Sequence, residues 1–313
     1  MYTTGSSEFG QLGNGATGEH FITANKIGFA NCSRFEPRTN FFTSEEKSFS
    51  TGTDDKKVQM MEEIRISYIA CGKNHAMAVE AAREGDEDKE RRVFSWGCGD
   101  YGCLGHGVQA DEFYPRQLVF FKNRMFSKNS PTKVSCGGQC SLILTERGHG
   151  YYFGRHKNVG DAAMRPALMD ALASNGHIVT SLSSGAQSII CCTKSGVTVT
   201  WGSGPYGELG YGINGSKSSS KPQFVSVMDS CIVTKVRSGY GCSVFLIRDD
   251  DEEDKKALKK LQSIEIEDVE EFDMASMELY KQKHSGNMAE DAERNLGKRK
   301  QTDSSKGEKK AKN

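Results

Sequence analysis

The sequence predicts an all-β fold, a partial β-propeller of about four blades. Two short motifs alternate along residues 1–248, and corresponding glycines of the second motif lie 48 to 65 residues apart. Glycine is abundant, with 34 of 313 residues, which disfavours helix bundles and coiled coils. There is no long apolar run, so a membrane-spanning helix and a membrane partner are not expected.

The first motif reads W-G-x-G-x-Y-G-x-L-G-x-G. It starts at Trp96 and Trp201, a related copy starts at Thr4, and a decayed copy keeps only the aromatic-glycine start at Phe153. Glycine is needed where the backbone takes positive φ or where a neighbouring blade approaches, and the large apolar residues fill the wedge between blades. The residues to which we assign this repeat-structural role are Trp96, Gly97, Gly102, Leu104, Gly105, Trp201, Gly202, Gly207, Leu209 and Gly210.

The second motif is a Cys-Gly or Ser-Gly turn that leads into an apolar run. Its glycines are Gly72, Gly137, Gly185 and Gly239, and their spacings of 65, 48 and 54 residues suit propeller blades or solenoid turns. Short β-rich runs bounded by glycine hairpin turns favour blades. Two positions recur, one held by Cys71 and Cys136 and the other by His75, Cys140, Ser188 and Cys242. We expect the cysteines and the histidine there to fill small buried sites.

Together the two motifs resemble the regulator-of-chromosome-condensation repeat family, a seven-bladed β-propeller. The resemblance covers about residues 1–248, and Ser203–Gly212 with Arg248–Lys256 is similar in particular to the second paralogue, the mitotic telophase-disc type. Four repeat units are visible where the family has seven. The resemblance therefore implies a chain that lacks the N-terminal blades; a self-associating half-ring is the alternative.

Residues 249–313 are predicted to leave the propeller as a charged tail, part helical and mostly disordered. Residues 249–273 hold 12 acids and 4 bases, whereas residues 298–313 hold 7 bases and 2 acids. An imperfect apolar stripe predicts a helix from about Glu252 to Lys283. Two small basic clusters predict nuclear targeting, with a solubilising tail as the alternative; their residues are Lys298, Arg299, Lys300, Lys309 and Lys310.

Two insertions interrupt the repeat. They are the polar segment Thr43 to Lys57 and the charged segment Arg83 to Arg92. Surface insertions cost little, so each is expected to be a solvated loop, with partner docking as the alternative.

No motif indicates a catalytic, metal or cofactor site. Residues 97–102 and 202–207 spell the dinucleotide fingerprint, but the next residues, Leu-Gly-x-Gly, disfavour the helix that a pyrophosphate would need. The 10 cysteines have no zinc-ligand spacing, and without a secretory signal they are expected to be reduced.

The resemblance implies a regulator of mitosis and of small GTPases of Rac, Ral or Ran type. The resemblance further implies association with chromosomes, centromeres or the spindle, and residence in the nucleus with a cytoplasmic pool. Any catalysis would be guanine-nucleotide exchange, which needs no nucleophile or general base. The alternative is a non-enzymatic scaffold of the same fold that binds chromatin or microtubules. A ubiquitin ligase carrying such a propeller would need a catalytic domain that this sequence does not contain.

Overall fold

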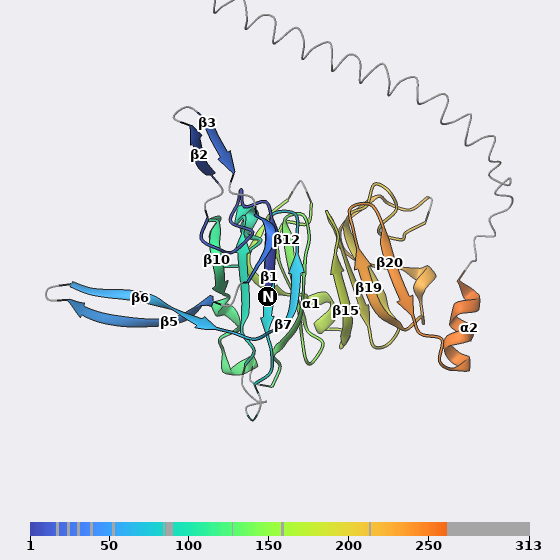
Figure 1. Ribbon diagram of the computed structural model, residues 1–313. Helices are drawn as coiled ribbons and strands as arrows, with labels where there is room; N and C mark the ends of the chain where they lie inside the picture. Colours follow the sequence, from blue (N-terminus) through green and yellow to red (C-terminus); the bar gives the residue numbers. More distant parts are fainter. Residues whose placement is uncertain are drawn as a thin grey trace, which may run out of the picture. The chain divides into compact units, whose positions relative to one another are not determined.

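The structure is a computed structural model with a compact unit from Met1 to Leu261 (Figure 1). It describes residues 1–16, 19–23, 26–29, 32–37, 40–51, 54–83, 85, 90–126, 128–157, 160–212 and 214–261. The five basic residues predicted to target the nucleus lie outside this part of the chain.

Three antiparallel meanders of four strands form the centre of the unit; the first is extended to a six-stranded sheet by a long hairpin, and the other two are four-stranded sheets. The first sheet contains β7 (Ile66–Cys71), β8 (His75–Glu80), β9 (Val93–Gly97) and β10 (Glu112–Gln117). The second contains β11 (Pro131–Cys136), β12 (Cys140–Thr145), β13 (Gly150–Gly154) and β14 (Ala163–Leu168). The third contains β15 (Val179–Ser184), β16 (Ser188–Thr193), β17 (Thr198–Ser203) and β18 (Ser218–Phe224).

Two half-sheets flank these three sheets. At the start of the chain β1 (Tyr2–Gly5) pairs with β4 (Cys32–Pro37), and after the third sheet β19 (Val233–Ser238) pairs with β20 (Ser243–Ile247). The first motif begins on the third strand of a blade, so β1 and β4 correspond to the third and fourth strands of a blade. The second motif joins the first strand to the second, so β19 and β20 correspond to the first and second strands of a blade. The prediction of an all-β partial propeller is confirmed, and its four repeat units are distributed over three complete sheets and two halves.

Two hairpins are added to this plan. Strands β2 (Glu19–Thr23) and β3 (Lys26–Phe29) form one of them. Strands β5 (Asn40–Thr51) and β6 (Asp54–Glu63) form a long one that joins the edge of the first sheet through a parallel pairing of β5 with β10 (Figure 1). The polar insertion Thr43 to Lys57, expected as a solvated loop, is therefore largely β-hairpin.

The helices are short. They are η1 (Asp100–Gly102), η2 (Val119–Phe121), η3 (Arg124–Phe126), α1 (Asp170–Ala173), η4 (Ser226–Met228) and α2 (Glu252–Lys260). Within the described residues, none is long and apolar enough to cross a membrane. The side chain of Asp251 caps α2 by accepting from the backbone N–H groups of Glu253 and Asp254. Ala257 is buried and Leu261 packs on the last half-sheet, so the compact unit runs past residue 248 to Leu261. The predicted helix beyond Leu261 lies outside the described residues.

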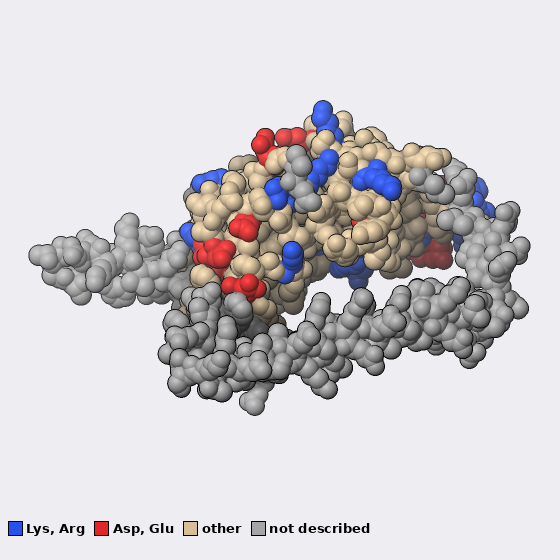
Figure 2. Space-filling model, turned by 90° about the horizontal axis from the view of Figure 1, so that it is seen from above, with Lys and Arg blue, Asp and Glu red and all other residues tan. Residues whose placement is uncertain are grey.

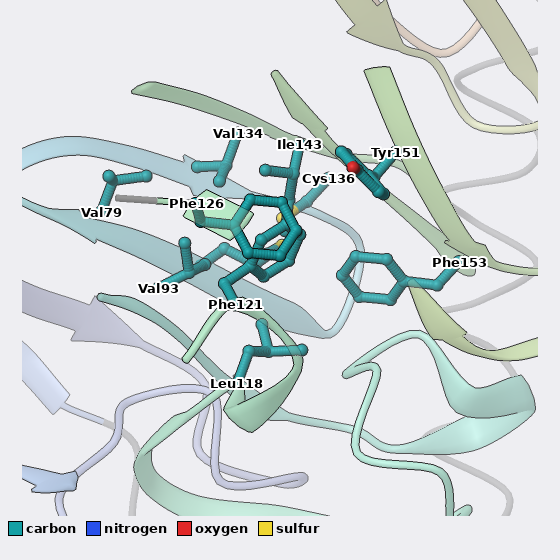
Figure 3. Packing of buried hydrophobic residues seen from close by; sticks show 11 residues of the cluster. Val79, Val93, Leu118, Phe121, Phe126, Val134, Cys136, Ile143, Tyr151 and Phe153 are labelled. Atoms are coloured by element: carbon teal, nitrogen blue, oxygen red, sulfur yellow. The ribbon is translucent and has the colours of Figure 1, made fainter. Parts of the chain in front are cut away.

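The core consists of apolar layers between neighbouring sheets. Between the first and second sheets, Val79 and Val93 meet Val134, Ile143 and Phe153, with aromatic rings from the connection that carries η2 and η3 (Figure 3). Trp201 lies in the layer between the second and third sheets, and Trp96 in the layer that contains Phe41 and Phe94. Burial of these side chains between sheets is the main stabilising contribution to the stack.

The last half-sheet leaves one side of its second strand uncovered. Val244 of β20 is 64 % exposed, whereas its counterparts Leu142 of β12 and Ile190 of β16 are 0 % exposed. The difference follows from position: β12 and β16 have a third strand and a further sheet beside them, and β20 has neither among the described residues.

The cysteines of the second motif follow the same rule. Cys136 and Cys140 are buried as predicted, but Cys71 and Cys242 are exposed. Cys136 reaches back toward the carbonyl of Ala70 on the preceding inner strand, a neighbour that Cys71 does not have. Cys242 belongs to the half-sheet that no further sheet covers among the described residues. The expectation of buried sites was therefore wrong for these two thiols.

The second insertion connects β8 to β9 and is held at both ends by a buried carboxylate. Arg92 donates from Nε to Glu80 at 2.8 Å and from Nη1 to Glu62 at 2.7 Å, and Arg83 also donates to Glu80 at 2.9 Å. Burial alone would raise the pKa of Glu80, but the hydrogen bonds from the two arginines outweigh it and lower the pKa. These ion pairs fix where the charged loop leaves and re-enters the first sheet.

Candidate functional site

One end of the stacked sheets gathers both repeat motifs. In an antiparallel meander, the turn from first to second strand and the loop from third to fourth strand emerge at the same end. The second motif supplies the turns and the first motif supplies the loops. We call this end the turn face: turns 72–74, 137–139, 185–187 and 239–242, and the described residues of the loops 98–111, 155–162 and 204–217. It is the upper end in Figure 1, and Figure 2 views it from above, with both basic (blue) and acidic (red) side chains scattered across it.

The turn glycines are fixed by the next turn along the stack. A Cβ added at Gly72 would lie 2.5 Å from the carbonyl oxygen of Gly137, and one at Gly137 would lie 2.6 Å from that of Gly185. Real Cβ atoms do not approach so closely, so only glycine fits. Backbone hydrogen bonds of 3.1 Å join the same turns. The N–H of Lys73 donates to the carbonyl of Gly137, that of Gly138 to the carbonyl of Ala186, and that of Ala186 to the carbonyl of Gly239.

Side chains at the shared position beside these turns also link one sheet to the next. Nε2 of His75 lies 2.9 Å from Oγ of Ser141, and Sγ of Cys140 lies 3.0 Å from Oγ of Ser184. Burial lowers the pKa of His75 to about 4, so the ring is neutral at physiological pH. Within the described residues, no group of three or more His, Cys, Asp or Glu side chains is placed to hold a metal ion.

A hydrogen bond from a serine or threonine hydroxyl spans each of the three aligned loops of the first motif, and these hydroxyls were not identified from the sequence. The residue before each motif start donates to the carbonyl of the motif leucine: Thr3 to Leu12 at 2.9 Å, Ser95 to Leu104 at 2.7 Å and Thr200 to Leu209 at 2.8 Å. The signal was available, because a serine or threonine precedes all three aligned motif starts.

The first motif also supplies large apolar side chains. Trp96, Leu104, Trp201 and Leu209 are buried. The glycines to which a repeat-structural role was assigned take positive φ, among them Gly97 at 100° and Gly202 at 112°. No helix follows the glycines at the fingerprint positions. The loop after Gly97 contains the short turn η1 and continues into β10, so the loop has no helix N-terminus for a pyrophosphate.

A cavity of about 580 Å³ opens among the four turns. Its wall contains all four turn glycines together with Lys73, Gln139, Arg155, Lys157 and Tyr240. Lys73 and Tyr240 occupy the same turn position as Gly138 and Ala186, so the middle turns are small and the outer two carry large side chains. A volume of this size is typical of small-molecule sites, which span about 300 to 1,000 Å³.

Arg155 is held in a fixed direction at this cavity. Its guanidinium carbon lies 3.4 Å from the ring centroid of Tyr101, and Nε and Nη2 donate to the side-chain oxygen of Gln139 at 3.2 and 2.9 Å. A stacked and hydrogen-bonded guanidinium is oriented in advance for an anion.

Comparison with known proteins identifies the repeat. A model described as the regulator of chromosome condensation (RCC1) repeat matches residues 92–144 and 196–246. Each matched segment runs from the third strand of one sheet to the second strand of the next, which is the offset seen in the half-sheets. The chain belongs to the RCC1 repeat family. Its two motifs are thus the two halves of one RCC1 repeat.

Curated relatives extend the match over most of the chain. A zebrafish (Danio rerio) protein named Protein RCC2 homolog is 35 % identical over 262 residues, covering 83 % of this chain and 48 % of its own length. The human protein named Protein RCC2 is 32 % identical over 262 residues, covering 83 % of this chain and 46 % of its own length. The chain spans about half the length of the curated relatives it matches.

A solved RCC1-type structure supports the fold. The crystal structure of Prp20p from Saccharomyces cerevisiae superposes with a TM-score of 0.51 at 18 % identity, covering 82 % of this chain and 54 % of that one. That crystal structure was described together with the binding properties of Prp20p to Gsp1p and histones. At this identity the likeness concerns the fold alone.

Proposed function

We propose that this RCC1-repeat chain is an interaction protein of mitosis and small-GTPase regulation, with guanine-nucleotide exchange as its candidate activity. The observation that carries the proposal is the similarity to proteins named RCC2 over 83 % of the chain. Prp20p, which shares the fold, is described as binding Gsp1p. The GTPases to test are therefore of Ran, Rac and Ral type.

The turn face is the surface that we assign to this partner. Rigid sheets position its loops, and binding residues are commonly carried on such loops. Tyr206 and Tyr240 lie there with ring centroids 6.3 Å apart and are 68 % and 79 % exposed. Exposed aromatic pairs are frequent anchors of protein interfaces.

The test is release of a fluorescent guanine nucleotide from a panel of GTPases of these three types. The chain should accelerate release from at least one member, and the double variant Tyr206→Ala/Tyr240→Ala should lower that acceleration about tenfold or more, as loss of an interface anchor does. Phe224→Ala is the matched control, since Phe224 is 66 % exposed but lies on β18 rather than in a turn-face loop. No acceleration of any member would refute exchange activity.

A non-enzymatic scaffold is the second candidate. The binding of Prp20p to histones favours chromatin as its ligand, and microtubules are the alternative ligand. Co-sedimentation with reconstituted nucleosomes and with polymerised tubulin separates the two. Binding to either polymer without any nucleotide release would replace the exchange proposal with the scaffold.

Localisation to the nucleus and to mitotic chromosomes or spindle, with a cytoplasmic pool, is part of the proposal. Basic side chains in an extended segment can bind an acidic receptor groove without a prior fold. The test changes Lys298, Arg299, Lys300, Lys309 and Lys310 to Ala in a tagged chain. Interphase nuclear signal should fall, and an unchanged signal would assign import to another segment or to a bound partner.

A further inference from the structure

The inner strands and turns of the stack carry positive charge and no negative charge. Residues 66–74, 131–139, 179–187 and 233–241, which contain the innermost strands and their turns, include four basic and no acidic residues. Those basic residues are Lys73, Lys133, Lys235 and Arg237. Arg155 and Lys157 add two more charges at the cavity mouth. Charges of one sign that line a concave surface attract counter-ions, because the low-dielectric wall focuses their field.

The cations at the cavity have neutral partners. Arg155 donates to an amide oxygen and stacks on a tyrosine ring, and neither group carries a compensating charge. Lys73 and Lys157 form no ion pair with any described residue. Some arginines elsewhere in the same unit are paired with carboxylates, namely Arg83, Arg91, Arg92, Arg116 and Arg248. The cavity therefore combines three cations that lack a carboxylate partner among the described residues.

We infer that this cavity binds a compact polyphosphate anion through Lys73, Arg155 and Lys157. Its volume of about 580 Å³ suits a molecule of metabolite size. Arg155 supplies a planar, oriented guanidinium that matches phosphate oxygens, and the two lysines supply mobile point charges. The amide nitrogen of Gln139, whose oxygen accepts from Arg155, is a neutral donor in the same wall.

The turn geometry favours a small polyanion over an acidic peptide strand. A peptide that bound in extended form would need free backbone groups on the cavity wall. The N–H groups of Lys73, Gly138 and Ala186 already donate to the adjacent turns. Recognition is thus left to side-chain cations, which suffice for phosphate groups. This inference does not depend on the identity of any protein partner.

The experiment is isothermal titration of the 313-residue chain with sodium tripolyphosphate. Binding should be saturable, one to one, and weaker as NaCl is raised, because salt screens the charges. The variant Arg155→Gln/Lys157→Gln should bind about tenfold more weakly or worse, since it removes two charge-assisted contacts. The matched control is Arg147→Gln/Lys194→Gln, which removes the same charge from exposed turns at the opposite end of the sheets. Circular dichroism confirms that each variant is folded.

Two further arms identify the ligand class. In the first, a nucleoside triphosphate binds with the affinity of tripolyphosphate, and Tyr240→Ser does not change that affinity; this result supports recognition of the phosphates alone. In the second, the nucleoside triphosphate binds more tightly than tripolyphosphate, and Tyr240→Ser weakens its binding; this result identifies a nucleotide as the source of the phosphates. Absence of saturable tripolyphosphate binding would overturn the inference. The inference would also be overturned if Arg147→Gln/Lys194→Gln weakened tripolyphosphate binding as much as Arg155→Gln/Lys157→Gln does, or if a hexaglutamate peptide bound more tightly than tripolyphosphate.

Discussion

Arg237 on β19 donates from Nη2 to the hydroxyl of Tyr68 on β7 at 3.0 Å, although 169 residues separate them. β7 is the inner strand of the first complete sheet and β19 is the inner strand of the last half-sheet. The row β7, β11, β15, β19 therefore curves until its two ends are in hydrogen-bond contact. This curvature brings the four turns around one cavity, which a flat row of sheets would not do.

The first prediction concerns this contact. Tyr68→Phe should lower the free energy of unfolding by no more than about 1 kcal/mol, because the hydrogen bond is exposed and competes with water. Urea unfolding followed by circular dichroism measures it. A loss above about 3 kcal/mol would show that closure of the inner row, and not packing between sheets, dominates stability.

The second prediction tests the close approach of consecutive turns. Gly137→Ala should destabilise the fold by about 2 kcal/mol or more, because its Cβ would lie 2.6 Å from the carbonyl oxygen of Gly185. Gly239→Ala is the matched control at the same repeat position, where the nearest atom to a new Cβ is 3.6 Å away. Denaturant midpoints should fall for Gly137→Ala and stay near the parent value for Gly239→Ala. Equal losses would mean that turn flexibility, not the neighbouring turn, selects glycine.

These glycines illustrate how far the sequence could predict the fold. The spacing of Gly72, Gly137, Gly185 and Gly239 predicts blades, because a repeat at this period places equivalent residues at equivalent positions. It does not reveal that Gly72, Gly137 and Gly185 each face the carbonyl oxygen of the next turn, since that contact lies between sheets. The sequence also did not predict that the first and last repeat units each form half a sheet. The repeat motif starts on a third strand, and sequence alone does not mark where a blade begins.

The candidate site was less predictable than the fold. Lys73 stands at a variable position of the second motif and Arg155 and Lys157 lie outside both motifs. The three residues become neighbours only because the stack curves. Tyr240 stands where other turns have Gly138 and Ala186, a departure visible in the aligned repeats but without meaning until the cavity is seen. The hydroxyls of Ser95 and Thr200, in contrast, could have been found by extending the alignment by one residue.

The third prediction is a pH dependence caused by His75. Burial lowers the pKa of this ring from 6.5 to about 4, against a smaller opposing effect of a backbone hydrogen bond. As pH falls below 6.5, the unfolded chain takes up a proton and the folded chain does not. The stability that the neutral ring provides is therefore present above pH 6.5 and lost as pH falls to about 4, by up to roughly 3 kcal/mol.

His75→Cys tests this, since Cys140 fills the equivalent position and also contacts a serine of the next sheet. The variant should lose less stability between pH 6.5 and 4 than the parent chain, as measured by urea unfolding at each pH. Burial and the charge of Arg116 lower the pKa of His106 to about 4 as well, but His106 is present in both proteins and cancels in the comparison. Parallel pH profiles would rule out His75 as the source.

The last prediction follows from the exposure of two thiols. Cys242 and Cys71 should react with a maleimide in the native chain, whereas Cys140 and Cys191 should react only after denaturation. All four have the same chemistry, but the first two are exposed and the second two are buried between sheets. Burial also raises the pKa of Cys140 to about 11, so its reactive thiolate is scarce at neutral pH.

Cys242 should label faster than Cys71, because partial burial raises the pKa of Cys71. Peptide mass spectrometry over a time course gives the order, and denatured protein gives the control in which all sites label. Native labelling of Cys140 at the rate of Cys242 would contradict the packing of the second sheet against the third. Conversely, any further sheet that packed on either side of the stack should protect Cys71 or Cys242, because each thiol occupies a position that a neighbouring inner strand covers elsewhere.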